Sequence, residues 1–251
     1  MNHQLEHIKE LLALSTKDQR EEIYRELRKE FPIHAIELKL NAEAEIILEA
    51  ISRAGDLTLR GIRGIIAEAA FATKLVATLP GWKDTTPTGN YPYDFVLTDG
   101  HGEIRVQVKM QRQKNHRPMM ANEGYRFLPA DMFVAETQRT RGGKHPTTGE
   151  NTRPYKFNEF DILAISLHPS RGDWSRFLYT VSSCLLPRPE DQKLMLKFQP
   201  VPKEPNETWT DDFLTCVSWF RSHETRRPAI TVPFITRAKK KKRKPPKKTT
   251  T

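Results

Sequence analysis

The chain has 251 residues, of which 37% are hydrophobic and 29% are charged, a composition that suits a globular protein and excludes an intrinsically disordered one. No apolar run approaches the roughly 20 residues of a membrane-spanning helix, and the N-terminal segment MNHQLEHIKELL is too polar for a signal peptide. These features predict a soluble, intracellular protein without a membrane partner.

The formal charge of +10 is concentrated at the C-terminal end. Nine basic residues and no acidic one lie in 237–248, so the rest of the chain carries only +1. With no hydrophobic periodicity and two adjacent prolines, 237–251 is predicted to be a disordered basic tail that could hold phosphates. A solubilising tail and a nuclear-import signal are equally good interpretations.

The two cysteines, Cys184 and Cys216, are too few for a disulfide framework or a four-cysteine zinc site. We expect both to be small buried apolar side chains in a reducing compartment. The four tryptophans are scattered along the chain, which is more typical of core or interface residues than of base-stacking platforms.

The first half of the chain is predicted to be mainly helical. From Leu5 to Ser52 apolar residues recur at helical spacing, interrupted at Pro32, which predicts two or three amphipathic helices. A further helix should begin at Thr58 and end before Pro80 and Gly81. We therefore expect a helical subdomain over residues 1–55, a core over 56–236 and the tail over 237–251.

The core alternates between strand and helix patterns. Strands are predicted over Tyr91–Thr98 and Glu103–Gln111, joined as a hairpin by Asp99-Gly100-His101-Gly102. Thr137–Pro154 contains no aliphatic or aromatic core residue and is predicted to be a mobile basic loop. Later elements are strands over Phe160–Leu167, Arg176–Val181 and Ile230–Phe234, and a helix capped by Thr210. The mixture predicts an α/β fold with a mixed sheet flanked by helices.

The hairpin register brings polar side chains together. If Gly100 and His101 form a two-residue turn, opposite positions sum to 201, which places Asp94 opposite Gln107 at roughly 5 Å. Alternation adds Lys109 to that face. The opposite, apolar face should pair Phe95 with Val106, Leu97 with Ile104 and Tyr93 with Val108.

A carboxylate, an amide oxygen and an ammonium group suit phosphodiester hydrolysis with a divalent metal. Hard oxygen ligands from Asp94 and Gln107 would hold Mg²⁺, and Lys109 would orient or deprotonate the attacking water and stabilise the phosphorus centre. The alternative is a plain cross-strand salt bridge between Asp94 and Lys109 on a solvated face.

Asp94, followed after twelve positions by Gln107-x-Lys109, resembles the motif of the PD-(D/E)xK nuclease superfamily, and type II restriction endonucleases are the most similar members. Tyr93 stands at the position of the name-giving proline, with Pro92 one residue earlier, and Gln107 replaces the usual acid. The resemblance covers roughly residues 58–182. It implies a restriction-endonuclease-like fold, dependence on Mg²⁺ and cleavage of DNA.

The same resemblance extends to the helix before the hairpin, because GIIAEAAF looks like the glutamate-bearing helix of that superfamily. Glu68 is therefore expected to be a third metal ligand and auxiliary catalytic acid. Helical spacing puts Glu68 on a stripe expected to face the sheet, formed by Gly61, Gly64, Ile65, Ala72 and Leu75. The alternative is a surface glutamate paired with Arg60 or Lys74.

Basic residues surround the predicted site. The strand after the hairpin turn and its exit contain no acid between 105 and 117, and the predicted loop adds further cations. The predicted DNA contacts are Arg105, Arg112, Lys114, Arg117, Arg139, Arg141, Lys144 and Arg153. Protection of an edge strand by cations, and a loop without function, are the respective alternatives.

These observations predict a Mg²⁺-dependent, sequence-specific endonuclease for double-stranded DNA, resembling type II restriction enzymes and located in the cytoplasm of a prokaryote or in a phage system. A palindromic target would require a homodimer, for which the N-terminal helices could supply either the dimer surface or a DNA contact. The alternatives are a structure-specific nuclease, such as a junction resolvase or repair nuclease, and a DNA-binding protein without catalysis.

Overall fold

The computed structural model describes residues 3–31, 34–139, 153–223, 226 and 230–233. It divides into two units, Met1–Gly61 and Ile62–Thr251. The predicted basic tail and most of the predicted mobile loop, including Arg141 and Lys144, lie outside the described residues. Within the described ranges, no helix combines the length and hydrophobicity that a bilayer crossing requires.

The N-terminal unit contains more helices than the two or three predicted. Helix α1 spans His3–Leu14, α2 spans Lys17–Glu30, α3 spans Ile36–Leu40 and α4 spans Ala44–Ser52. The first break comes from Thr16, whose side chain accepts the amide of Gln19 while the Gln19 side chain accepts the amide of Thr16. This reciprocal cap starts α2 without any proline or glycine.

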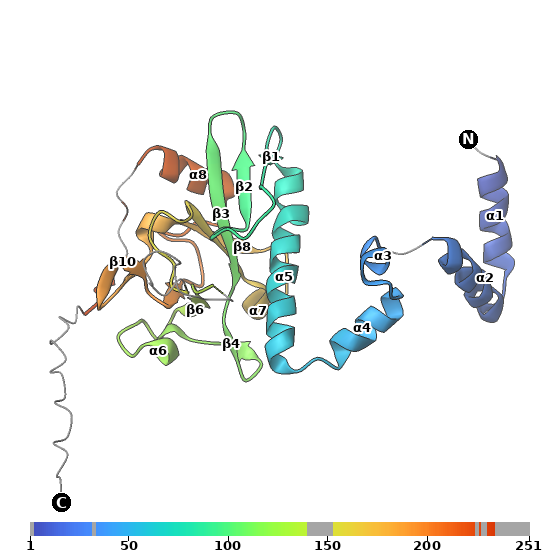
Figure 1. Ribbon diagram of the computed structural model, residues 1–251, viewed down its shortest axis with the longest axis horizontal. Coiled ribbons are helices and arrows are strands. Elements are labelled where there is room, and N and C mark those ends of the chain that lie inside the picture. Colours follow the sequence, from blue (N-terminus) through green and yellow to red (C-terminus); the bar gives the residue numbers. More distant parts are fainter. Residues whose placement is uncertain (1–2, 32–33, 140–152, 224–225, 227–229, 234–251) are drawn as a thin grey trace, which may run out of the picture. The chain divides into compact units, whose positions relative to one another are not determined.

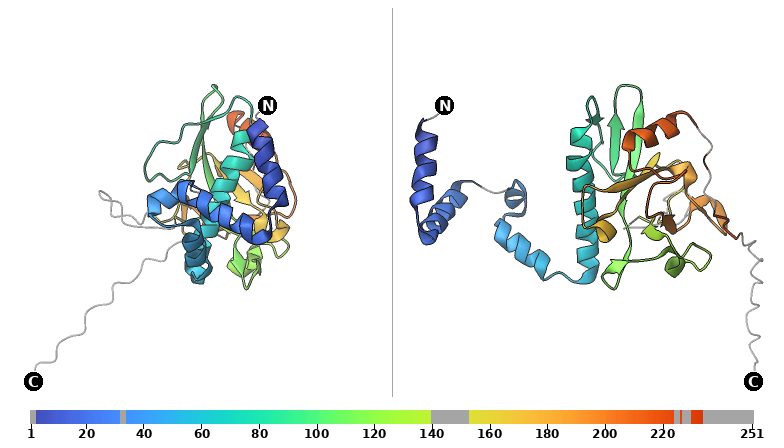
Figure 2. Two further views of the ribbon diagram at one scale, coloured as in Figure 1. Left: turned by 90° about the vertical axis from the view of Figure 1, so that its right-hand side faces the viewer. Right: turned by 180° about the vertical axis from the view of Figure 1, so that it is seen from behind.

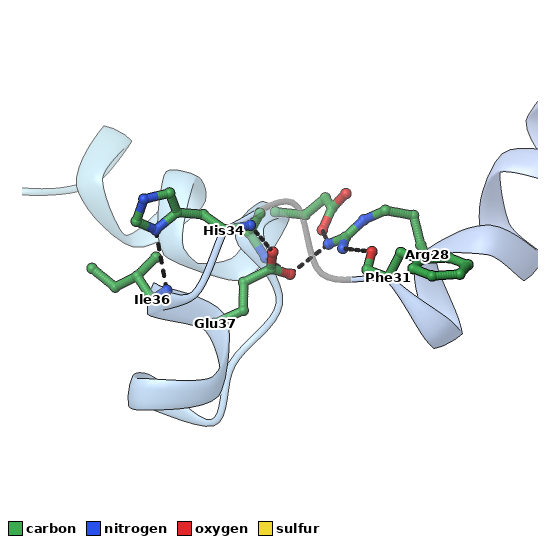
Figure 3. Close-up of polar contacts among 7 residues, drawn as sticks. Arg28, Phe31, His34, Ile36 and Glu37 are labelled. Atoms are coloured by element: carbon green, nitrogen blue, oxygen red, sulfur yellow. Dashed lines mark hydrogen bonds and ion pairs between the residues drawn. The ribbon is translucent and has the colours of Figure 1, made fainter. Parts of the chain in front are cut away.

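An ion cluster around the buried Glu37 links three of these helices (Figure 3). Arg28 of α2 donates to Glu37 of α3 at 2.6 Å and to Glu45 of α4 at 3.1 Å. Glu37 also accepts the backbone amides of His34 and Ala44. Arg28 therefore holds the pKa of Glu37 down at about 2, well below its ordinary value.

A five-stranded mixed sheet organises the second unit, as predicted (Figure 1). Its order is β1-β2-β3-β7-β8, with β3 and β7 parallel and the other neighbours antiparallel. The strands span Lys83–Asp84 (β1), Phe95–Thr98 (β2), Glu103–Met110 (β3), Ile162–Ser166 (β7) and Phe177–Val181 (β8).

The predicted hairpin register is confirmed between β2 and β3. Phe95 pairs with Val106 and Leu97 pairs with Ile104, so opposite positions sum to 201. The two-residue turn is wrong, because the last pair is Thr98 with Glu103 and a four-residue loop follows. Asp99 in that loop binds Arg221 at 2.7 and 2.8 Å instead of pairing with Gly102.

Helices α5 (Asp56–Lys74) and α8 (Phe213–Arg221) pack against one face of the sheet. The contacting stripe of α5 contains Ala67, Ala70 and Phe71, and Phe71 packs against aromatic rings from β2, β8 and α8. The predicted place of Ile65 on this stripe is wrong, because Ile65 is 64% exposed. Packing against the sheet therefore selects a neighbouring face of the helix.

Two other predictions about the C-terminal part of this unit are wrong in detail. Helix α8 is capped by Asp212, whose carboxylate accepts the amide of Thr215, and not by Thr210. Residues 230–233 of the predicted strand Ile230–Phe234 form no strand, and Phe234 lies outside the described residues. At the edge of the sheet, Tyr179 of the last strand makes an isolated antiparallel bridge with Thr210, where no strand was predicted.

The opposite face of the sheet is covered by a second layer seen from behind in Figure 2. Strand β6 (Phe133–Glu136) pairs with β11 (Phe198–Val201), and Tyr155, Phe160 and Trp209 pack under them. Tyr93 joins this side, stacked on Tyr91, so its predicted place beside Phe95 is wrong. The pairing of β2 ends at Phe95, which frees Tyr93 to turn.

The remaining short elements are α6 (Ala121–Gly124), α7 (His168–Arg171), β4 (Gln113–Lys114), β5 (Arg117–Pro118), β9 (Pro187–Arg188) and β10 (Asp191–Met195). One-turn 3₁₀ helices cover Val76–Thr78 and Ser182–Cys184. Cys184 and Cys216 are both buried free thiols, as predicted. Trp82, Trp174 and Trp219 pack against the first core cluster, as expected for core residues.

Candidate active site

Asp94, Gln107, Lys109 and Glu68 meet where β2 begins, beside the C-terminal half of β3. Asp94 stands one residue before β2 and is fixed there by its amide, which donates to Val106 at 2.9 Å. Gln107 and Lys109 belong to β3, and Glu68 comes from α5. Asp94 and Lys109 are the two charges that act on the Glu68 carboxyl, so the fold brings all four positions into one neighbourhood.

The Asp94 carboxylate is held by two donors on β3. Its Oδ2 accepts the Val108 amide at 2.8 Å and the side-chain amide of Gln107. Burial raises the pKa of Asp94, and Lys109 with these two donors opposes that shift. Both of these hydrogen bonds end on Oδ2. Oδ1 accepts no hydrogen bond from the described residues, so it is the oxygen that would bind a metal ion.

Gln107 is 2% exposed and presents its nitrogen, not its oxygen, to Asp94. Its Oε1 accepts the hydroxyl of Tyr155 at 3.1 Å. A half-turn of the amide exchanges nitrogen and oxygen, and the Tyr155 hydroxyl can accept as well as donate. After that turn the Gln107 oxygen would face Asp94, as a metal ligand must, and Tyr155 would remain a partner, whereas the 3.2 Å hydrogen bond from the Gln107 nitrogen to the Val108 carbonyl would be lost.

Glu68 is a partly buried carboxyl with a strongly altered acidity. Burial raises its pKa to about 7, the negative charge of Asp94 adds to the rise, and Lys109 opposes it. The alternative of an ordinary surface glutamate paired with Arg60 or Lys74 does not describe this environment. Two neighbouring carboxyl groups that resist ionisation together are typical of a site that binds a cation.

Lys109 keeps some accessible surface although protein atoms surround it. Burial alone would lower its pKa, but Tyr155, Asp94 and Glu68 together raise the pKa above its ordinary value. Its Nζ lies 5.9 Å from the ring centre of Tyr155. Lys109 is therefore an ammonium group at neutral pH in this arrangement.

Tyr155 is a member of this site that sequence reasoning missed. It is 3% exposed, and burial raises the pKa of its hydroxyl while Lys109 opposes the rise. The guanidinium carbon of Arg139 lies 5.8 Å from its ring centre. No local pattern marks this tyrosine, because it reaches β3 only through the folding of the segment that follows the predicted loop.

Gln111 is a second residue that was missed. Strand alternation continues from Gln107 through Lys109 to Gln111, which forms a bridge with Ala135. Gln111 is 1% exposed, and neither polar atom of its side chain has a partner among the described residues. A buried amide without partners costs about 1–3 kcal/mol, so this group calls for a partner such as a water or a bound ligand.

The donor set fits a hard divalent cation. Asp94 and Glu68 supply carboxylates, and Gln107 supplies an amide oxygen after the half-turn; oxygen ligands of this kind suit Mg²⁺. The described residues contain no group of three histidine, cysteine or acidic side chains placed to hold a metal, so the neutral Gln107 would have to complete the set. The unpartnered amide of Gln111 is consistent with a ligand at this end of β3.

Five of the eight basic residues predicted to contact DNA form ion pairs with acidic side chains. Arg105 binds Asp161 at 2.7 Å, and Arg139 binds Glu159 at 2.9 Å. Three more are paired with acids from later in the chain: Arg112 with Glu136, and Lys114 and Arg117 with Glu123. The basic residues of this acid-free run are thus paired with acids from elsewhere in the chain, with Lys114 and Arg117 sharing one carboxylate, and DNA contact by these residues stays a prediction.

The ends of the predicted basic loop are described and lie close to the site. Gln138 makes a bridge with Pro154, and the Arg139 amide donates to Arg153 at 3.0 Å. Thr137 is buried and donates its hydroxyl to Leu196. The described residues on either side of 140–152 therefore contact one another next to Tyr155 in the chain.

No protein-family model matches the sequence, and no curated protein matches it. Among solved structures, the chain resembles a bacterial homing endonuclease, I-Ssp6803I, with a TM-score of 0.31 and 20% sequence identity. The match covers 51% of this chain and 71% of that chain. Both similarity values are low, so the function of this chain has to be inferred from the chemistry of its own site.

Proposed function

We propose that this protein is a Mg²⁺-dependent nuclease that hydrolyses phosphodiester bonds in DNA. The observation that carries the proposal is the meeting of two carboxyl groups with raised pKa, a lysine and a buried amide at one end of a hairpin. More specifically, we propose a sequence-specific endonuclease for double-stranded DNA, similar in chemistry to type II restriction enzymes, that acts as a homodimer.

The acidic and amide side chains and the lysine would have different roles in the reaction. Asp94, Glu68 and Gln107 would hold the metal, which when bound supplies neutralisation of phosphate charge and a lower pKa for water. Lys109 would bind a phosphate oxygen and stabilise the developing negative charge, or orient or deprotonate the attacking water. Tyr155 positions Gln107.

The test uses the full chain with unmethylated phage or plasmid DNA, in Mg²⁺ and in EDTA. Discrete fragments in Mg²⁺ alone are expected, with Asp94→Ala and Lys109→Ala each slowing cleavage by about 100-fold or more. Asp191→Ala and Lys74→Ala, which remove exposed side chains of the same types, should cleave like the parent protein.

The outcomes separate the functional classes. Cleavage of junction DNA with intact linear duplex would make the protein a structure-specific nuclease. Intact DNA of both kinds, with binding that disappears when 237–251 is deleted, would overturn nuclease activity and leave a DNA-binding protein. Full activity of Asp94→Ala would discard the site.

A further inference from the structure

Most exposed large apolar side chains of the described chain lie in its first 57 residues. Fourteen of the eighteen are found there, on α1 to α4, at Phe31 after α2 and at the start of α5. They are Leu5, Ile8, Leu11, Leu14, Ile23, Tyr24, Leu27, Phe31, Ile36, Leu38, Leu40, Ile46, Leu48 and Leu57. Exposure on this scale marks a surface that is covered by a partner.

The N-terminal unit lacks a core of its own. No apolar side chain in the described part of residues 3–61 is buried, whereas the second unit has three buried clusters. Helices of the lengths of α1 and α2, 12 and 14 residues, are marginal in water without tertiary packing. Contacts from outside the unit must therefore stabilise these two helices.

The apolar side chains of α1 and α2 follow helical stripes. Leu5, Ile8 and Leu12 recur at three- and four-residue spacing in α1, and Ile23 and Leu27 continue the pattern in α2. A shallow groove runs beside the second stripe, lined by Ser15, Gln19, Glu22, Ile23, Glu26 and Leu27. Ridges of one helix can pack into such a groove.

The charges of this surface exclude nucleic acid and anionic lipid as the partner. Residues 1–61 contain twelve acidic and nine basic residues, a net charge of −3. In 3–31 seven acidic and six basic residues alternate, so the polar faces carry both signs. A phosphate-binding surface would be basic, whereas a surface with both signs is complementary to a copy of itself.

We propose that α1 and α2 form a homodimer interface by packing against the same two helices of a second copy of the chain. Together they expose seven large apolar side chains that such an interface would bury: Leu5, Ile8, Leu11, Leu14, Ile23, Tyr24 and Leu27. A twofold arrangement places each apolar stripe on its own counterpart, as an isologous interface requires. This surface is separate from the nuclease site, although it provides the dimer that the proposed function needs.

The test is sedimentation equilibrium of the full chain at about 0.15 M salt, a condition that screens weak charge contacts. We expect twice the chain mass of 29.1 kDa. The variant Ile8→Gln/Leu27→Gln, which removes two side chains that are each 52% exposed, should weaken the dimer by at least about tenfold. Glutamine keeps good helix propensity, and circular dichroism of both proteins checks that helix content is retained.

A matched control makes the same chemical change elsewhere. Ile65→Gln/Leu214→Gln removes an isoleucine and a leucine that are 64% and 45% exposed in the second unit, and this variant should remain a dimer. A monomeric parent chain would overturn the proposal and indicate that the stripes are covered within one chain. A mass of 29.1 kDa with cleavage retained would leave the proposed nuclease activity standing and overturn the homodimer, whereas an inactive dimer would overturn only the nuclease activity.

Discussion

Glu68 shows how burial of one carboxyl couples stability to function. Its pKa is about 7 in the folded chain against an ordinary value of 4.5, so the folded state binds more protons between those pH values. Stability contributed by the protonated form is therefore lost as pH rises from about 4.5 to about 7. Above pH 7, and without a metal, an ionised Glu68 destabilises the fold.

Replacing Glu68 by glutamine should stabilise the second unit and impair catalysis. In EDTA at pH 8 we expect Glu68→Gln to unfold at a higher urea concentration than the parent protein. Its free energy of unfolding should be larger by about 1–3 kcal/mol, after allowance for the partial exposure of this residue. At pH 5 the difference should shrink, because Glu68 is then mostly protonated. Urea unfolding followed by tryptophan fluorescence reports this unit, which holds all four tryptophans. An equal effect at both pH values would contradict the raised pKa.

Gln107 offers a test of the metal set. Gln107→Glu replaces an amide that must turn by an anionic oxygen ligand, so half-maximal cleavage should need about tenfold less Mg²⁺. A Mg²⁺ titration of the cleavage rate measures this. Gln113→Glu, a change of the same kind on β4, is the control. An unchanged Mg²⁺ requirement in Gln107→Glu would show that Gln107 is a structural residue.

At the scale of elements, β3 is the centre of the second unit. Val106 and Val108 contribute to the core under α5 and α8, while Gln107 and Lys109 point to the other face. The parallel pairing of β3 with β7 runs to Met110 and Ser166, which holds the end of β3 in place. One strand thus connects the packing of the sheet to the position of the site.

In the N-terminal unit the contact of Arg28 with Glu37 predicts sensitivity to acid. The pKa of Glu37 is lowered to about 2, so the stability that its ionised form contributes is present above about 4.5 and is lost as pH falls toward 2. Hydrogen exchange of peptides from α2 to α4, normalised to intrinsic rates, should show loss of protection over this range. Glu37→Gln should show reduced protection at pH 5 already; parent-like protection there would contradict the prediction.

For the whole molecule, charge is distributed unevenly along the chain. The net charge is −3 over 1–61 and +4 over 62–236, and the basic segment adds +9. Acids from other parts of the chain pair with the basic residues around the site, and residues 237–251 account for +9 of the formal net charge of +10. Long-range attraction of DNA should depend mainly on that segment.

Deletion of 237–251 should therefore change binding more than chemistry. The slope of log K for duplex DNA against log salt should fall by up to about 8, since nine cations are removed. Cleavage at low salt and saturating DNA should be within a few-fold of the parent rate. Filter binding over a range of salt concentrations measures the slope, and an unchanged slope would place the phosphate contacts in the folded part.

The sequence by itself determined the mixed sheet, the hairpin register and the proximity of Asp94, Gln107 and Lys109, because strand alternation and the Gly-containing turn act over short stretches of chain. Predictions were wrong by one to three residues for the hairpin turn, the N-cap of α8 and the buried face of α5. The local sequence allows several neighbouring caps, turns and helix faces, and packing selects among them.

Only the tertiary structure decided which distant residues complete the site. Tyr155 binds Gln107, and Glu123 and Glu136 pair with cations near β3. Gln111 is buried without a partner among the described residues because of where β6 and the segment around 155 fold against the sheet. Such contacts depend on the path of the whole chain and on the burial that it creates. Burial changes the pKa and hydrogen bonding of a side chain without changing the local pattern around it.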